Sequence, residues 1–248
     1  MFMNKIQIYP SIEDVVQQTS GVFIKAAAEA IQQKDVFSVA LSGGNTPQPL
    51  YTYLAENPAG DILDWNKLHF FWGDERAVPL DHSDSNFRQA YHALLQPLHI
   101  PPENIHRIQG ELDPATAAKN YQREILNWFE EIPPRFDLIL LGMGSDGHTA
   151  SLFPGTAAVI NPPKNSWVLP NYVPRLSTWR ITFIPKLINA AAQVIFLVTG
   201  QSKAETLLAV HEGEYLPERL PSQLIKPVNG SQVWILDQAA GELLSTNL

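Results

Sequence analysis

The chain has 248 residues, and its 17 Lys and Arg residues against 25 Asp and Glu residues give a formal net charge of −8. Because it contains no cysteine, disulfide bonds, cysteine–zinc sites, iron–sulfur clusters and thiol nucleophiles are excluded. The negative charge argues against nucleic acid as a partner. The first ten residues lack the features of a signal peptide, and no apolar run reaches the roughly 18–20 residues that span a bilayer, so we expect a cytoplasmic protein without a membrane partner.

The elements predicted for the first half of the chain alternate between strands and helices. In chain order they are a strand at 5–9, a helix at 12–34, a buried strand at 36–41, a helix through 46–56, a buried strand at 68–72 and helices at 86–95 and 115–131. The helix at 12–34 is the best marked, because its apolar residues recur at helical spacing. Ser11 stands before it as an N-cap, with Asp14 in the capping-box position.

The second half continues the alternation. In chain order it gives a buried strand at 136–141, shorter strands at 167–170 and 181–184, a helix at 185–191, a strand at 194–199, a helix within 200–212 and a last strand at 233–236. The stretch 161–174, which is rich in Pro and Asn, is expected to be a surface loop. This order predicts an α/β fold: one domain over 1–248, with a Rossmann-like, open, mostly parallel sheet and helices on both faces.

Polar segments of unusual composition follow four of the buried strands. They are SGGNTP at 42–47, GDER at 73–76, GMGSDGHTAS at 142–151 and GQSK at 200–203. The carboxyl ends of parallel strands form one edge of a sheet, where ligands bind in open α/β folds. We therefore expect these four segments to meet at a single site.

The segment 42–47 has the composition of an anion-binding loop. Its glycines let backbone N–H groups approach an anion, and the helix that follows adds the positive end of its dipole. The segment lacks the Lys of a Walker A loop, and a simple capped turn explains the same residues.

Two cations stand at corresponding places after other strands. Lys203 lies near the start of a helix, where the dipole opposes a cation unless an anion is bound. Arg76 ends the GDER segment beside Asp74 and Glu75. The competing explanations are a solvated surface lysine for Lys203 and a local ion pair for Arg76.

The segment 142–151 holds the best candidate for acid–base chemistry. It matches G-x-G-x-x-G, but no acidic residue follows at the distance that a dinucleotide site requires, so that interpretation is rejected. Asp146 and His148 remain, two residues apart in a glycine-flanked turn. Histidine can take up a proton near neutral pH, and a nearby carboxylate can orient its ring. The other six histidines lack such surroundings and are expected to be structural or solvated.

Taken together, the motifs identify a resemblance to the 6-phosphogluconolactonases. It is carried by LSGGNTP, FFWGDERAVP with Ser85-Asn86 downstream, LGMGSDGHTASLFPG, RITF and TGQSKAETL, in the family's order from residue 41 to about 210. The resemblance implies hydrolysis of a sugar phosphate lactone by a general base, without a cofactor or metal. It leaves the oligomeric state open between a monomer and a small homo-oligomer.

The resemblance also implies roles for particular residues. His148 would activate water, with Asp146 as its catalytic partner, and Asp146 and Asp74 would line the ring-binding part of the pocket. The residues implied to hold the sugar phosphate are Ser42, Gly43, Gly44, Thr46, Arg76 and Lys203. Arg180, in RITF, would be a further substrate contact, and Ser85 and Asn86 would shape the loop.

Two alternatives stay open. A glucosamine-6-phosphate deaminase or isomerase shares Asp74 and the D-G-H turn, but such enzymes carry a glutamate where this chain has Phe153 and a tyrosine where it has Arg76. A sugar-phosphate sensor would need an output module, and only about 35 residues precede the first core motif.

Overall fold

The computed structural model describes residues 4–245, which form a six-stranded sheet and a smaller three-stranded sheet. Every pairing in the larger sheet is parallel. In spatial order its strands are β1 (Asn4–Tyr9), β9 (Ser231–Asp237), β8 (Gln193–Val198), β5 (Leu138–Leu141), β2 (Phe37–Leu41) and β3 (Leu68–Trp72). The predicted α/β class and mostly parallel sheet are therefore confirmed.

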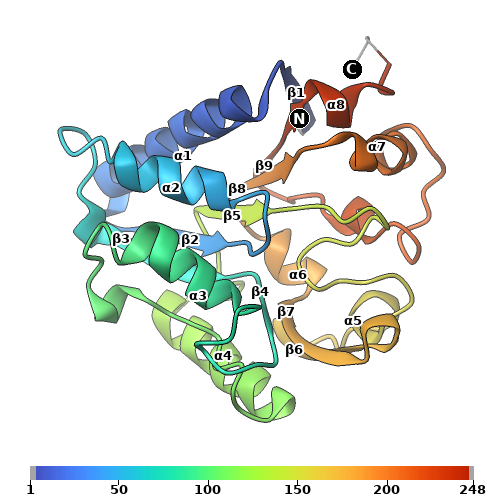
Figure 1. Cartoon of the computed structure of the whole chain (residues 1–248). Coiled ribbons are helices and arrows are strands. Elements are labelled where there is room, and N and C mark those ends of the chain that lie inside the picture. Colours follow the sequence, from blue (N-terminus) through green and yellow to red (C-terminus); the bar gives the residue numbers. More distant parts are fainter. Residues whose placement is uncertain (1–3, 246–248) are drawn as a thin grey trace.

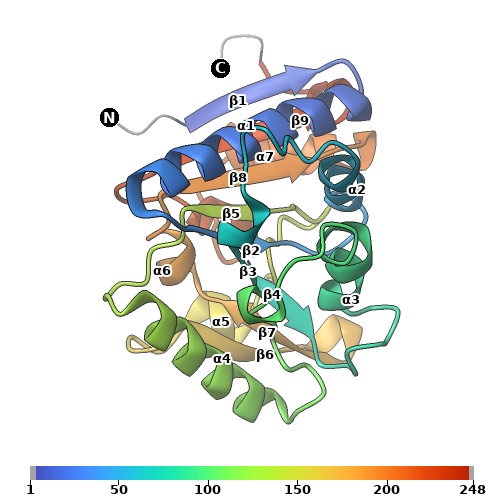
Figure 2. The ribbon, with the colours of Figure 1, turned by 90° about the vertical axis from the view of Figure 1, so that its left-hand side faces the viewer.

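Helices lie on both faces of the larger sheet, and others pack against the smaller sheet. In chain order the α-helices of the described residues are α1 (Ile12–Lys34), α2 (Gln48–Glu56), α3 (Asn86–Ala90), α4 (Pro114–Phe129), α5 (Ala157–Ile160), α6 (Pro185–Ile188), α7 (Ala204–His211) and α8 (Gln238–Gly241). Figure 1 shows their order in the chain, and Figure 2 shows α1 in front of the sheet with α7 behind it. The predicted cap of α1 is present, because the Ser11 hydroxyl accepts a hydrogen bond from the Asp14 N–H at 3.1 Å.

The smaller sheet was not predicted. It consists of β4 (Asp74–Arg76), β7 (Thr178–Phe183) and β6 (Val168–Val173), all antiparallel, with α4 packed against β6 and β7. The loop prediction for 161–174 is wrong for its second half, because residues 168–173 form β6. The strand predicted at 167–170 overlaps the start of β6, and the one predicted at 181–184 overlaps the end of β7. Pro170 is tolerated in β6 because β6 lies at the sheet's edge.

Gly73 joins the two sheets. Its N–H donates to the Leu41 carbonyl of β2 at 3.0 Å, and its carbonyl accepts from the Phe183 N–H of β7 at 2.8 Å. The chain therefore leaves the larger sheet at Trp72 and enters the smaller one at Asp74. This change of sheet carries Asp74 and Arg76 past the end of β3.

One hydrophobic core lies beneath both sheets. Phe136 is fully buried between Phe71 of β3 and Phe183 of β7, at ring-centroid distances of 5.1 Å and 5.4 Å. The smaller sheet is thus packed firmly against the larger one. Within residues 4–245 the structure contains no helix long and apolar enough to cross a membrane. The cytoplasmic location stays a prediction.

Candidate active site

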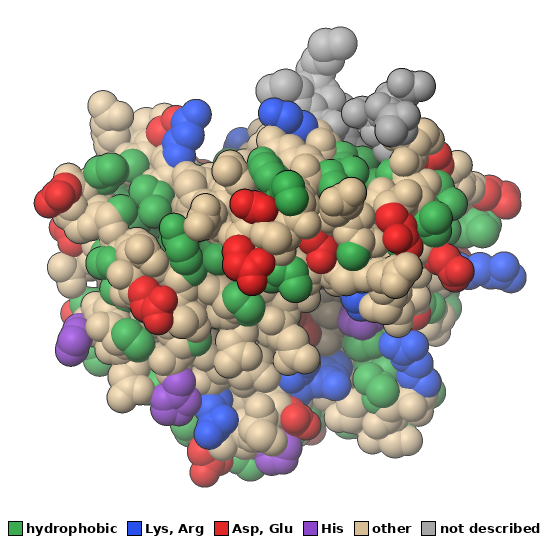
Figure 3. Space-filling view, turned by 45° about the horizontal axis from the view of Figure 1, so that its top comes forward, with side chains coloured by type: hydrophobic (Ala, Val, Ile, Leu, Met, Phe, Trp, Pro, Cys, Tyr) green, Lys and Arg blue, Asp and Glu red, His purple; other side chains and the backbone are tan. Residues whose placement is uncertain are grey.

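A cavity of about 210 Å³ lies at the carboxyl ends of the parallel strands, and all four polar segments contribute to it. The residues that line it are Ser42, Gly43, Gly44, Asn45, Thr46, Pro47, Asp74, Arg76, Asn86, Gly142, Met143, Gly144, His148, Ala150 and Lys203. In Figure 3, Lys, Arg and His side chains gather around a hollow at the lower right of the face. The expected convergence at one sheet edge is what the fold produces.

The loop 42–47 is held open toward the cavity by contacts on its other side. The Tyr51 hydroxyl of α2 accepts from the Ser42 N–H at 3.1 Å and donates to the Ser42 carbonyl at 2.7 Å. Gly44 has φ +96°, a left-handed conformation that favours glycine. A Cβ at Gly43 would lie 1.7 Å from Asn86 Oδ1, so only glycine fits there.

Asp74 is a buried carboxylate in the cavity wall. Its Oδ2 accepts a hydrogen bond from the Ser151 hydroxyl at 2.6 Å, and its backbone carbonyl accepts from the Asn86 side-chain amide at 2.9 Å. These two contacts fix the carboxylate between the smaller sheet and the turn that contains His148.

Glu75 points away from the cavity and organises the chain behind it. Its carboxylate accepts from the N–H groups of Arg76, Asn86 and Phe87 at 2.7–2.8 Å and from the Ser85 hydroxyl at 3.1 Å. Burial raises the pKa of Glu75, and the three backbone hydrogen bonds oppose that rise. The Ser85-Asn86 pair therefore shapes this loop through Glu75.

Arg76 and Arg180 face each other across the β4–β7 pairing. Among the described residues neither guanidinium has an ion-pair partner, and Arg180 Nε is buried without a hydrogen bond. Burial lowers the pKa of Arg180, and the charge of Arg76 lowers it further. Like charges opposite each other are unfavourable in a sheet, and a bound anion would offset that cost. Arg76 lines the cavity, whereas Arg180 is not among the lining residues.

His148 and Asp146 form a hydrogen-bonded pair, with Nδ1 of the ring 2.5 Å from Oδ1 of the carboxylate. An ionised carboxylate only accepts hydrogen bonds, so a neutral His148 carries its proton on Nδ1 and leaves Nε2 free to accept one. The hydrogen bond and charge of His148, with help from Arg175, lower the pKa of Asp146 to about 2, against the raising effect of burial. Asp146 is not among the residues that line the cavity, and its place in the ring-binding wall stays a prediction.

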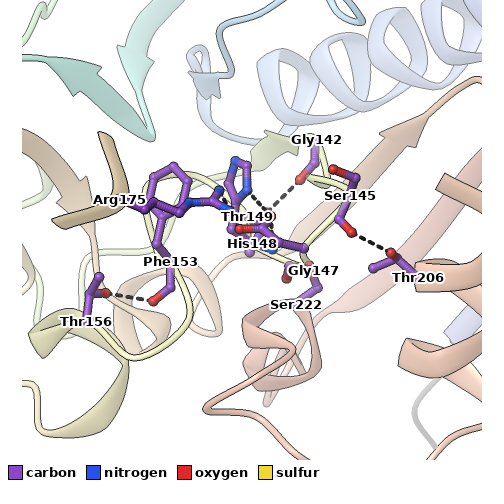
Figure 4. A network of polar contacts seen from close by, with 11 residues as sticks. Gly142, Ser145, Gly147, His148, Thr149, Phe153, Thr156, Arg175, Thr206 and Ser222 are labelled. Atoms are coloured by element: carbon purple, nitrogen blue, oxygen red, sulfur yellow. Dashed lines mark hydrogen bonds and ion pairs between the residues drawn. The ribbon is translucent and has the colours of Figure 1, made fainter. Parts of the chain in front are cut away.

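The turn that carries this pair is tightly constrained. The Gly144 N–H donates to the His148 carbonyl at 2.8 Å, and a Cβ at Gly144 would lie 2.0 Å from His148 Nδ1. The hydroxyls of Thr149, Thr206 and Ser222 donate to backbone carbonyls of residues 142, 145 and 147, at 2.7–2.8 Å (Figure 4). The imidazole is thereby held in one place by the turn beneath it.

Lys203 also lines the cavity. It ends a short 3-10 helix, Gln201–Lys203, directly before α7, as the sequence predicts. Burial lowers the pKa of Lys203, and the charge of Asp146 opposes this effect. Among residues 4–245 it makes no ion pair, which leaves its ammonium group available to an anion in the cavity.

Sequence reasoning did not identify Ser151 or place Arg175. Ser151 lies in the TAS segment after His148, and its hydrogen bond to Asp74 spans 77 positions in the chain. Arg175 pairs with Asp146 through Nη2 and Oδ2 at 2.5 Å, across 29 positions in the chain. Neither contact can be predicted from the sequence, because the partners come close only in the folded chain.

Known proteins resemble this chain along most of its length. The sequence profile described as glucosamine-6-phosphate isomerases/6-phosphogluconolactonase matches residues 10–234. The 6-phosphogluconolactonase of Synechocystis is 44% identical over 220 residues, covering 87% of this chain and 88% of its own. That of Haemophilus influenzae is 37% identical and covers 98% and 100%. A solved structure of 6-phosphogluconolactonase from Trypanosoma cruzi superposes with a TM-score of 0.87 at 29% identity, covering 98% of each chain.

Proposed function

The chain belongs to the family of glucosamine-6-phosphate isomerases and 6-phosphogluconolactonases, and we propose that it hydrolyses 6-phospho-D-glucono-1,5-lactone to 6-phospho-D-gluconate, a step of the oxidative pentose phosphate pathway. The observation that carries the proposal is His148 in the cavity wall, with its Nδ1 held by Asp146 and with cations and glycine amides around the same 210 Å³ cavity. That combination provides one base and one anion site.

The phosphate is held by the loop 42–47 and Lys203. This loop offers backbone N–H groups and the hydroxyls of Ser42 and Thr46 at the start of α2, and Lys203 adds a positive charge from the end of β8, two strands away in the sheet. Arg76 adds a second cation, and Arg180 opposite it in the β4–β7 pairing strengthens the local positive field. Binding the phosphate away from the reacting carbon orients the lactone and contributes to rate as well as affinity.

His148 activates the attacking water. Its Nε2 accepts a proton from water while the water oxygen forms a bond to C1 of the lactone, and the C1 carbonyl electrons move onto oxygen. Hydrogen-bond donors at the carboxyl edge of the sheet stabilise this oxyanion. When the tetrahedral intermediate collapses, the C1–ring oxygen bond breaks and the imidazolium returns its proton to the ring oxygen. The products are the carboxylic acid, which ionises in water, and a free hydroxyl.

The deaminase or isomerase alternative is disfavoured by the surroundings of His148. Its ring is stacked on Phe153 at a centroid distance of 4.1 Å, so an apolar side chain stands where deaminases of this kind carry a glutamate. Phe153 cannot take part in proton transfer. Hydrolysis of a lactone needs one base only, and the site supplies one.

The test is an assay of the purified protein on freshly generated 6-phosphogluconolactone, corrected for spontaneous hydrolysis, with glucosamine 6-phosphate in parallel. We expect rapid lactone hydrolysis and no release of ammonia. Ammonia release from the amino sugar with no lactone hydrolysis would replace this function with the deaminase. Full activity after exhaustive chelation is expected for the proposed chemistry, and its loss with recovery on adding a divalent ion would contradict the mechanism.

A further inference from the structure

Arg175 contacts the catalytic pair without lining the cavity. It lies on the short 3-10 helix Pro174–Leu176, at the tip of the hairpin between β6 and β7. Its Nη2 is 2.5 Å from Asp146 Oδ2, while Oδ1 of the same carboxylate binds His148 Nδ1, also at 2.5 Å. One carboxylate thus connects a permanent cation to the imidazole.

Phe153 gives Arg175 a second contact. The guanidinium carbon lies 5.0 Å from the centre of the Phe153 ring, and that ring is itself stacked on His148. Phe153 is 5% exposed, whereas the Arg175 side chain is 53% exposed. Figure 4 shows the three side chains together. The partly exposed Arg175 therefore contacts both Asp146 and Phe153, the two side chains that contact the His148 ring.

We propose that Arg175 is a positioning residue that holds Asp146 in place and keeps His148 unprotonated, and so able to act as a base, at neutral pH. This rests on the proposed lactone hydrolysis. Asp146 alone would favour the imidazolium, because an opposite charge in contact stabilises the charged form. The guanidinium shares the carboxylate's charge and repels a second positive charge close by.

Apart from His148, Arg175 is the cation that forms an ion pair with Asp146 among the described residues, and the other charged groups around His148 make no such contact. Lys203, from the strand end of β8, and Arg76, from β4, line the cavity and are expected to be neutralised when the substrate phosphate binds. Asp74, from β4, is a carboxylate and favours the imidazolium. Phe153 disfavours a charged ring but carries no charge of its own. Arg175 is the cation that stays beside the pair whether or not substrate is bound.

The test compares Arg175→Met with Arg175→Lys in two measurements. One is the pH dependence of kcat/KM for the lactone, and the other is the titration of the His148 imidazole by NMR without substrate, assigned by its absence in His148→Asn. In Arg175→Met we expect both midpoints to rise by about one pH unit, with the rate recovering to near the wild-type value at high pH. Arg175→Lys should keep both midpoints near those of the wild type.

Lys25→Met serves as the matched control, because it removes a positive charge from an exposed side chain on α1. It should move neither midpoint. Unchanged midpoints in Arg175→Met, or a lost rate that high pH does not restore, would overturn the proposal. If Arg175→Met does not fold, Arg175→Gln provides the same comparison. The NMR titration remains decisive even if the wild-type protein fails to hydrolyse the lactone, so failure of this inference and failure of the proposed function are distinguishable.

Discussion

At the scale of single residues, the site separates two tasks between different parts of the chain. His148 and Asp146 share one turn and supply the base. Lys203 and the loop 42–47, at the ends of other strands, form the proposed anion-binding site. Because the two groups do not hydrogen bond to each other, a change in one should leave the other's contribution intact. Substitutions at the two places should therefore have different kinetic effects.

His148→Asn should lower the rate constant for lactone hydrolysis by about 10²–10⁴-fold, the usual contribution of a general base. Asparagine can keep a hydrogen bond to the turn but cannot accept the proton, so the rise of the wild-type rate with pH should also vanish. Affinity for the product should change little, as measured by calorimetry with 6-phosphogluconate. A folded variant with turnover close to wild type would remove His148 from the mechanism.

Lys203→Ala should act mainly on binding of the phosphate. We expect weaker binding of the phosphorylated lactone by about 1.5–3 kcal/mol, the range for a hydrogen bond to a charged group. Hydrolysis of unphosphorylated gluconolactone should be nearly unaffected, which makes it the internal control. Equal losses on both substrates would show that Lys203 does not contact the phosphate.

Sequence reasoning predicted the residues of this site that lie directly after strands. It did not predict the contact of Ser151 with Asp74 or that of Arg175 with Asp146. Ser42, Asp74, His148 and Lys203 follow buried strands, so the parallel topology alone brings them together. Arg180 and Asp146, both expected to contact the substrate, are not among the residues that line the cavity: Arg180 lies opposite Arg76 in the β4–β7 pairing, and the Asp146 carboxylate contacts His148 and Arg175. Their distances from the substrate depend on side-chain direction, which spacing does not encode.

At the scale of elements, the smaller sheet decides the shape of the cavity wall. Its strand β4 has only three residues, and Glu75 in its middle ties the chain at 85–87 to it through backbone N–H groups. The parallel strands were predictable because they are long apolar runs, whereas a three-residue strand containing Asp, Glu and Arg has no strand pattern. Its pairing with β7 is a tertiary contact.

Glu75→Gln should disturb this wall without touching the substrate. A glutamine places an NH₂ group against N–H donors that the carboxylate now accepts, and leaving such buried donors unpaired costs about 1–3 kcal/mol of unfolding free energy. We also expect a higher KM, because Arg76 and Asn86 lose their support. Chemical denaturation and steady-state kinetics measure the two effects. Glu29→Gln, at an exposed position on α1, should change neither, and wild-type stability in Glu75→Gln would contradict this role.

At the scale of the whole molecule, two histidines away from the site make stability depend on pH. Burial lowers the pKa of His211, which packs edge-on against Trp234, to about 4. Burial and the neighbouring His106 lower the pKa of His69 to about 4 as well. An unfolded histidine titrates near pH 6.5, so between pH 6.5 and 4 the unfolded chain binds more protons than the folded one.

The free energy of unfolding should therefore be constant above about pH 7 and fall as the pH drops from 6.5 toward 4. His211 alone should account for roughly 2–3 kcal/mol of this loss, and the more exposed His69 for less. Urea unfolding followed by circular dichroism at pH 7.5, 6, 5 and 4.5 measures it. His211→Gln should flatten the curve. An equally steep curve in that variant would assign the acid sensitivity to other groups.

The position of β1 has a consequence for how the protein is made. In the larger sheet β1 lies at one edge, and its neighbour β9 is the last strand within residues 4–245. During synthesis the first strand to leave the ribosome must wait, unpaired, until residues 231–237 have followed it. The middle strands β2, β3, β5 and β8 can assemble earlier, and with them the four segments that form the cavity. Addition of β1 to the sheet is therefore a late event, because it has to wait until β9 has been made.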